Sequence, residues 1–148
     1  MHIVKNIEQY NSDHVYFCEP IKNNIMNNGI FIRIIYSTPL CMLNGIYLFI
    51  SISYTSIDKY YNKFKCTFDT FQHKNIIDNM YKIEEDILKK INITGKNPQL
   101  KIYEQLSNGN IKFFSDNMEK VNNSFLLKIA GIWETSNEYG LTYKFINV

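Results

Sequence analysis

The C-terminal part of the chain alternates between apolar and polar positions, a period of two that is typical of a half-buried strand. The alternation occurs in two arms within residues 124–148, on either side of the polar segment 134–138. Lys128 and Lys144 lie opposite the apolar stripes of their arms. The pattern therefore predicts an antiparallel hairpin with one apolar side and one side that carries hydroxyl and ammonium groups.

Earlier strands are predicted from β-branched, aromatic and alternating residues. Two Asn-Gly pairs, at positions 44–45 and 108–109, are strong turn signals for hairpins. They predict one hairpin from residues 40–43 and 46–54, and a second from residues 100–106 and 110–114. Further strands are expected at residues 15–18, 30–36 and 61–68.

A helix is predicted over residues 74–91, because apolar residues recur there at steps of three and four. Glu85 and Lys89 form a favourable pair four residues apart. The acidic run 84–86 points in several directions on a helix, so a solvated helix face is expected. The helix should end by Gly95, and Pro98 prevents it from resuming.

The order of elements, strands then one helix then more strands, predicts a β-rich α+β protein. The expected architecture is an OB-fold-like antiparallel barrel with one main helix, at about 74–91, and an extra hairpin. A β-sandwich with one helix is the alternative. No boundary divides the chain, so residues 1–148 are expected to form a single domain, with the polar segment 1–28 packing on or flanking it.

Composition and charge narrow the functional classes. The chain has 148 residues and a formal net charge of only +2, so it is not a polybasic protein, although basic groups could still gather on one face. Aromatic residues are frequent, with 11 Tyr and 10 Phe. Asn and Ile abound and Arg33 is the sole arginine, a codon bias typical of an AT-rich genome.

Catalytic and membrane signals are absent from the sequence. Cys18, Cys41 and Cys66 are widely spaced, which favours a reducing compartment and small packed side chains over disulfides. No histidine or cysteine pair has metal-ligand spacing, and no phosphate-binding glycine loop is present. The longest apolar run, residues 45–52, is far short of the roughly 20 residues that a spanning helix needs. We therefore expect a soluble intracellular protein that is not an enzyme, with no cofactor, no metal and no membrane partner.

A candidate binding face is predicted on the polar side of the strands, where lysines and aromatic residues interleave. Ammonium groups neutralise phosphates and rings stack on unpaired bases, the combination that binds single-stranded nucleic acid. A solvated sheet face is the alternative. For Trp133, packing against the core or the hairpin is the alternative to a stacking platform at the mouth of the barrel. The candidate residues are Arg33, Tyr61, Lys63, Lys65, Lys101, Tyr103, Lys112, Phe114, Lys128, Trp133 and Lys144.

The C-terminal block, residues 131–145, resembles the C-terminal signature of small proteins from nucleocytoplasmic large DNA viruses. Some of these are similar to phage-type single-stranded-DNA-binding proteins with an OB-fold. A weaker similarity extends through residues 83–91 and 104–113, so that it covers roughly the C-terminal half. The matching positions are Gly131, Trp133, Tyr139, Gly140, Leu141, Tyr143 and Lys144, preceded by Lys128.

The resemblance implies a viral protein that coats unpaired DNA during replication, recombination or repair. It implies single-stranded DNA, or RNA, and viral replication proteins as partners. The implied location is the host cytoplasm or a viral factory, with the nucleus or the virion as alternatives. We expect sequence-tolerant binding, with further copies of the chain as additional partners. The alternative is a non-enzymatic structural, scaffold or host-interaction protein that acts by self-association or protein binding.

Overall fold

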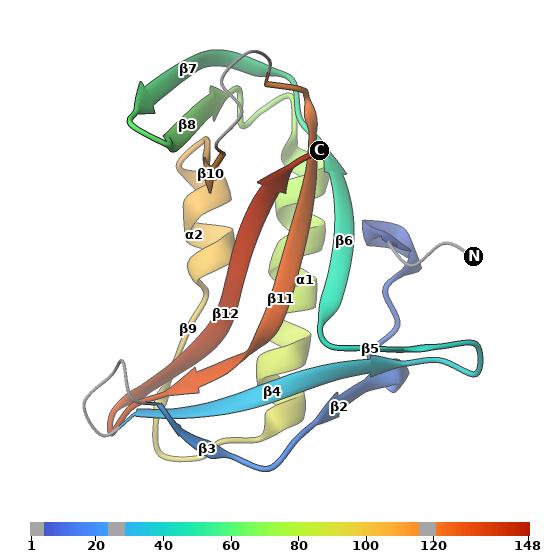
Figure 1. The fold of residues 1–148 in the computed structure, drawn as a ribbon. Coiled ribbons are helices and arrows are strands. Elements are labelled where there is room, and N and C mark those ends of the chain that lie inside the picture. Colours follow the sequence, from blue (N-terminus) through green and yellow to red (C-terminus); the bar gives the residue numbers. More distant parts are fainter. Residues whose placement is uncertain (1–4, 24–28, 116–120) are drawn as a thin grey trace.

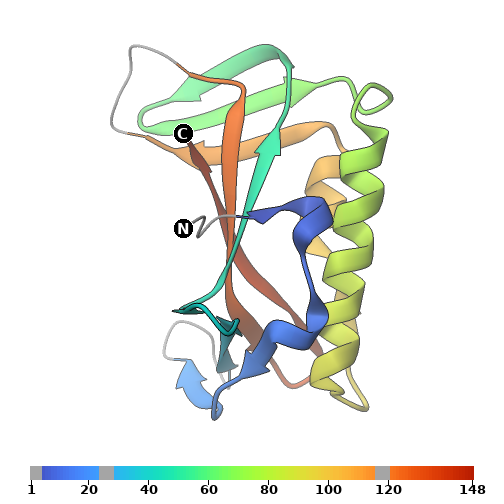
Figure 2. The same ribbon diagram turned by 90° about the vertical axis from the view of Figure 1, so that its right-hand side faces the viewer.

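The computed structural model describes residues 5–23, 29–115 and 121–148. It consists of a curved mixed sheet with two α-helices against one of its faces (Figures 1 and 2). The predicted β-rich α+β class is confirmed. We call the face that carries the helices the inner face and the opposite one the outer face.

The C-terminal hairpin forms as predicted, and it lies in the centre of the sheet. Strands β11 (Ser124–Glu134) and β12 (Glu138–Asn147) pair antiparallel, and a register shift lies between Ile129 and Gly131. The other edge of β11 is divided between two partners. Its first half pairs with β6 (Ile46–Ser51) and its second half pairs with β4 (Gly29–Ser37).

Three strands continue the sheet on the far side of β12. Strand β10 (Asn110–Phe114) pairs parallel with β12, and β8 (Lys63–Phe68) and β7 (Tyr54–Tyr60) follow in antiparallel order. The opposite end is the short β1 (Lys5–Asn6) beside β6.

The strand path β1-β6-β11-β12-β10-β8-β7 does not close on itself. The OB-fold-like barrel is therefore not confirmed, because among the described residues β7 and β1 do not pair. Nor do the described strands separate into two facing sheets, as the sandwich alternative requires, since hydrogen bonds join them in one network.

The first predicted hairpin is wrong. Short strand β5 (Met42–Leu43) pairs with β4, whereas β6 pairs with β11. Gly45, with a φ of 126°, makes a corner between them, and a Cβ there would lie 2.8 Å from the Ile129 carbonyl oxygen. The Asn-Gly signal thus marks a sharp change of direction. The long strand predicted over residues 46–54 also ends early, since Tyr54 begins β7.

Three further short strands lie at the margins. Strands β2 (Val15–Phe17) and β3 (Ile21–Asn23) pair with β4, and β9 (Asn97–Gln99) pairs with β12. Two short 3-10 helices, Ile7–Gln9 and Ser12–His14, precede β2. The hydroxyl of Tyr10 donates a hydrogen bond of 2.9 Å to Asp86, which ties this segment to the long helix.

Helix α1 spans Lys74–Ile91, as predicted. The second hairpin is wrong, because α2 occupies Lys101–Ser107 where a strand was expected. Ile102 and Leu106, four residues apart, are both fully buried, which is the spacing of a helix stripe. Gly109, with a φ of 78°, ends the helix instead of forming a hairpin turn.

The hydrophobic core fills the space between the inner face and the helices. Met80 and Ile87 of α1 are fully buried there, together with Phe125 and Leu127 of β11. Ile7 and Val15 belong to the same core, so the described part of the N-terminal segment packs on the domain. No helix within the described ranges is long and apolar enough to cross a membrane.

Candidate nucleic-acid interface

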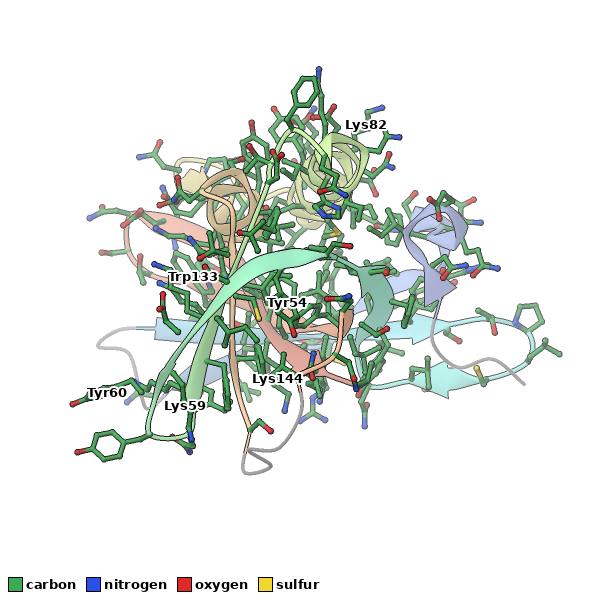
Figure 3. The ribbon with its side chains drawn as sticks, turned by 90° about the horizontal axis from the view of Figure 1, so that it is seen from above. Tyr54, Lys59, Tyr60, Lys82, Trp133 and Lys144 are labelled. Carbon is green, nitrogen blue, oxygen red and sulfur yellow. The ribbon has the colours of Figure 1, made fainter. Side chains whose placement is uncertain are left out.

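Four lysines lie side by side across four neighbouring strands of the outer face. Lys128 of β11 is opposite Lys144 of β12, and Lys112 of β10 is opposite Lys65 of β8. The two pairs adjoin, because Lys112 and Lys144 each precede one residue of the registered pair Phe113 and Phe145. We call Lys65, Lys112, Lys144 and Lys128 the lysine row. Figure 3 shows Lys144 on the opposite side of the sheet from Lys82 of helix α1.

The row concentrates positive charge that the net charge of the chain does not reveal. Neighbouring strands are about 4.8 Å apart, so the four lysines span about 14 Å at the backbone. Like charges directly opposite one another destabilise a sheet. Within the described part of the chain, no carboxylate forms an ion pair with these four residues. Asp58 of β7, opposite Lys65, is the acidic residue at the end of the row.

A second row of the same face is apolar. Leu126 of β11 lies between Phe49 of β6 and Ile146 of β12, and Phe114 of β10 follows beside Ile146. We call Phe49, Leu126, Ile146 and Phe114 the apolar row. The ring of Phe114 is 66% exposed, and the ammonium of Lys63 lies 5.7 Å from its centroid. The outer face therefore places a line of charge beside a line of apolar groups.

The lysine row begins beside an aromatic ring. Tyr47 of β6 lies opposite Lys128, and the Lys128 ammonium is 5.6 Å from the centroid of its ring. Tyr47 and Phe49 were missed by the sequence analysis, although they alternate with the buried Ile46 and Leu48. That alternation was the signal that could have found them.

A cavity of about 430 Å³ adjoins the other end of the row, against β7, β8 and β10. Phe64 and Phe113, which also line it, are buried and stack on each other with centroids 5.2 Å apart. The exposed side chains that share the outer face around the cavity are those of Asp58, Tyr60, Lys63, Lys65, Lys112 and Phe114.

Arg33 and Trp133 lie on the outer face at its far end. Arg33 of β4 is opposite Gly131, and Trp133 is opposite both Phe31 and Gly140. Trp133 is half-buried, and its ring would lie 2.8 Å from a Cβ added at Gly140. The indole thus packs against the hairpin, roughly 16 Å along β11 from Lys128 at ~3.3 Å per residue.

Three predicted site residues lie elsewhere. Tyr61 was expected in a strand but occupies the β7–β8 turn with a φ of 57°, next to the ring of Tyr60. Lys101 and Tyr103 are on α2 and hence on the inner side. Lys101 lies 3.6 Å from Glu104, and the Tyr103 ring packs on Tyr81 at 4.9 Å. The predicted alternation placed Lys101 and Tyr103 on the wrong face because residues 101–107 form a helix and not a strand.

The acidic run of α1 was expected to be solvated, which is wrong for Glu84. Its side chain is 0% exposed and accepts backbone N–H groups of Ile102 and Tyr103 at 3.0 and 2.9 Å. It thereby caps the start of α2. Burial raises its pKa to about 7, and the two backbone hydrogen bonds counteract this only in part.

Cys66 is buried within the core, and burial raises the pKa of its thiol to about 11, which makes it a poor nucleophile. The described residues bring together no group of three His, Cys, Asp or Glu side chains that could hold a metal ion. The lysine row and the apolar row beside it give the outer face groups that suit an anionic, partly apolar ligand.

Comparison with known proteins adds no assignment to this geometry. The chain matches no protein-family model, no curated protein and no solved structure.

Proposed function

We propose that this protein binds single-stranded nucleic acid, DNA in the first instance, without catalysing a reaction. The observation that carries the proposal is the lysine row, because four adjacent ammonium groups with no carboxylate partner among the described residues favour a polyanion. Phosphates that settle on the row would relieve the repulsion between its members and release their own counterions.

The apolar row favours unpaired strands over duplexes. Base stacking on exposed rings contributes ~1–3 kcal/mol per base, and a duplex keeps its base faces inside the stack. Phe49 and Phe114 supply rings beside the row, and Tyr60 lies near its end. Such contacts read every base alike, so the binding should tolerate any sequence.

In a viral setting this activity would protect unpaired DNA during replication or repair. The AT-rich codon bias and the C-terminal signature support that context, as does the mixture of lysine and aromatic groups on one face. We further propose that this open sheet derives from an OB-fold-like barrel.

The test is a titration of fluorescent single-stranded and duplex DNA at several salt concentrations. Binding should weaken with salt with a slope of about −3 in log–log form, since each phosphate contact contributes about −0.7 for a single strand. The double variant Lys112→Gln/Lys144→Gln should halve that slope. The matched control Lys74→Gln/Lys82→Gln removes the same charge from helix α1 and should leave the slope unchanged. Equal effects of the two double variants, or no binding at low salt, would sink the proposal.

A second candidate is self-association through the apolar row, favoured by the exposure of Phe49 and Phe114. Sedimentation of the wild-type protein and of Phe49→Ser/Phe114→Ser distinguishes the two. A dimer that the variant abolishes, without any DNA binding, would establish this alternative.

A further inference from the structure

The cavity at the end of the lysine row combines charged and aromatic side chains around a space for a small ligand. Its volume of about 430 Å³ lies in the range of small-molecule pockets, ~300–1,000 Å³. The described residues around it combine ammonium groups, exposed rings and a single carboxylate. A ligand that satisfies all three must carry an anion, an aromatic ring and a hydrogen-bond donor.

The cationic part is the pair Lys65 and Lys112. They lie directly opposite each other on β8 and β10, and no ion pair with a described carboxylate neutralises either one. An anion between the two would remove the repulsion that this register imposes. Asp58, opposite Lys65 on the other side, would repel an anion, so the phosphate position is confined to the space between Lys65 and Lys112.

The aromatic part is formed by Phe114 and Tyr60. Lys63 lies between them in register, opposite Phe114 on one side and opposite Tyr60 on the other. Phe114 and Tyr60 are 66% and 71% exposed, so both rings are open to contact with a ligand. A base could lie on the Phe114 ring, and the Asp58 carboxylate is an acceptor for a base N–H group.

We propose that this cavity binds one nucleotide, with the phosphate between Lys65 and Lys112 and the base against Phe114. The inference rests on the proposed function. The site would hold one nucleotide of the bound single strand at the β7 end of the lysine row. The same chemistry admits a free mononucleotide.

The experiment follows backbone amide chemical shifts of the full chain during titration with deoxythymidine monophosphate, thymidine and inorganic phosphate in turn. The monophosphate should bind at least about tenfold more tightly than either fragment and should shift the amides of Lys65, Lys112 and Phe114. Lys65→Gln and Phe114→Leu should each weaken it by about tenfold. Lys82→Gln on helix α1 and Phe71→Leu, an exposed ring outside both rows, are the matched controls and should change it less than twofold.

A parallel titration with a short oligonucleotide separates the two proposals. Oligonucleotide binding without any response to the monophosphate would overturn the nucleotide site and leave the proposed function intact. Monophosphate binding with no tighter binding of the oligonucleotide would support the site and refute strand coating. Inorganic phosphate that binds as tightly as the monophosphate would overturn recognition of the base.

Discussion

The buried carboxylate of Glu84 should make the stability of this protein fall as the pH rises from 5 to 8. In the folded state, burial raises its pKa to about 7 from an ordinary value of 4.5. Between those values the folded chain holds a proton that the unfolded chain has released, so unfolding is increasingly favoured as the pH increases.

The magnitude follows from the two pKa values. Each unit of difference corresponds to about 1.4 kcal/mol, and most of the interval from 4.5 to 7 is crossed between pH 5 and pH 8. Glu84 alone should lower the free energy of unfolding by about 2–3 kcal/mol across that range. Tyr143, whose pKa burial raises to about 12, stays neutral throughout.

The perturbation is Glu84→Gln, which cannot ionise yet keeps a carbonyl oxygen to accept one N–H group of α2. Urea unfolding of the wild-type protein and the variant at pH 5, 6, 7 and 8 measures the effect. The difference between the two proteins should change by about 2–3 kcal/mol in favour of the variant as the pH rises.

The control is Glu85→Gln, one residue further along the same helix. Glu85 is solvent-facing and bound to Lys89 at 2.7 Å, and this hydrogen bond and the one with Tyr81 lower its pKa. The Glu85→Gln variant should lose as much stability between pH 5 and pH 8 as the wild-type protein does. Parallel pH dependences of the wild-type protein and Glu84→Gln would refute the reasoning.

Three substitutions test the geometry of the outer face and its turns. Gly131→Ala should destabilise the protein by about 3 kcal/mol in urea unfolding, because the new Cβ would lie 2.4 Å from the Ile32 carbonyl oxygen; a neutral effect would contradict this packing. Gly140→Ala should displace the Trp133 ring and shift its fluorescence to the red, whereas an unchanged spectrum would place the indole elsewhere. Tyr61→Gly should stabilise the protein by about 1 kcal/mol, since the left-handed backbone conformation is strained for Tyr, and a loss of stability would mean that the ring contact with Tyr60 outweighs that strain.

Hydrophobic periodicity identified the elements that have one buried face and one solvent-facing side along their whole length. Helix α1 and the hairpin of β11 and β12 follow directly from periods of 3.6 and 2. The segment Lys101–Ser107 was misread because Ile102 and Leu106 are four residues apart, a spacing that suits either a strand or a short helix. The remote partner Glu84, which caps this helix, could not be read from the local sequence.

The four lysines of the row were predictable from the sequence, but their alignment and the other members of the site were not. Alternation placed Lys65, Lys112, Lys128 and Lys144 on the polar sides of their strands. Their alignment into one row depends on the register of strands that are far apart in sequence, such as β8 with β10 and β10 with β12. Tertiary contacts set that register, and no local pattern records it.

The division of β11 between β4 and β6 has a consequence for how the chain folds as it is synthesised. These two strands precede β11 by about half of the chain, and each needs a separate half of β11 to complete its hydrogen bonds. On the ribosome, β4 and β6 are therefore synthesised before the strand that joins them. Contacts of such long sequence separation form slowly. Pulsed hydrogen exchange during refolding should find the amides of β4 and β6 becoming protected together, in the same step as those of β11.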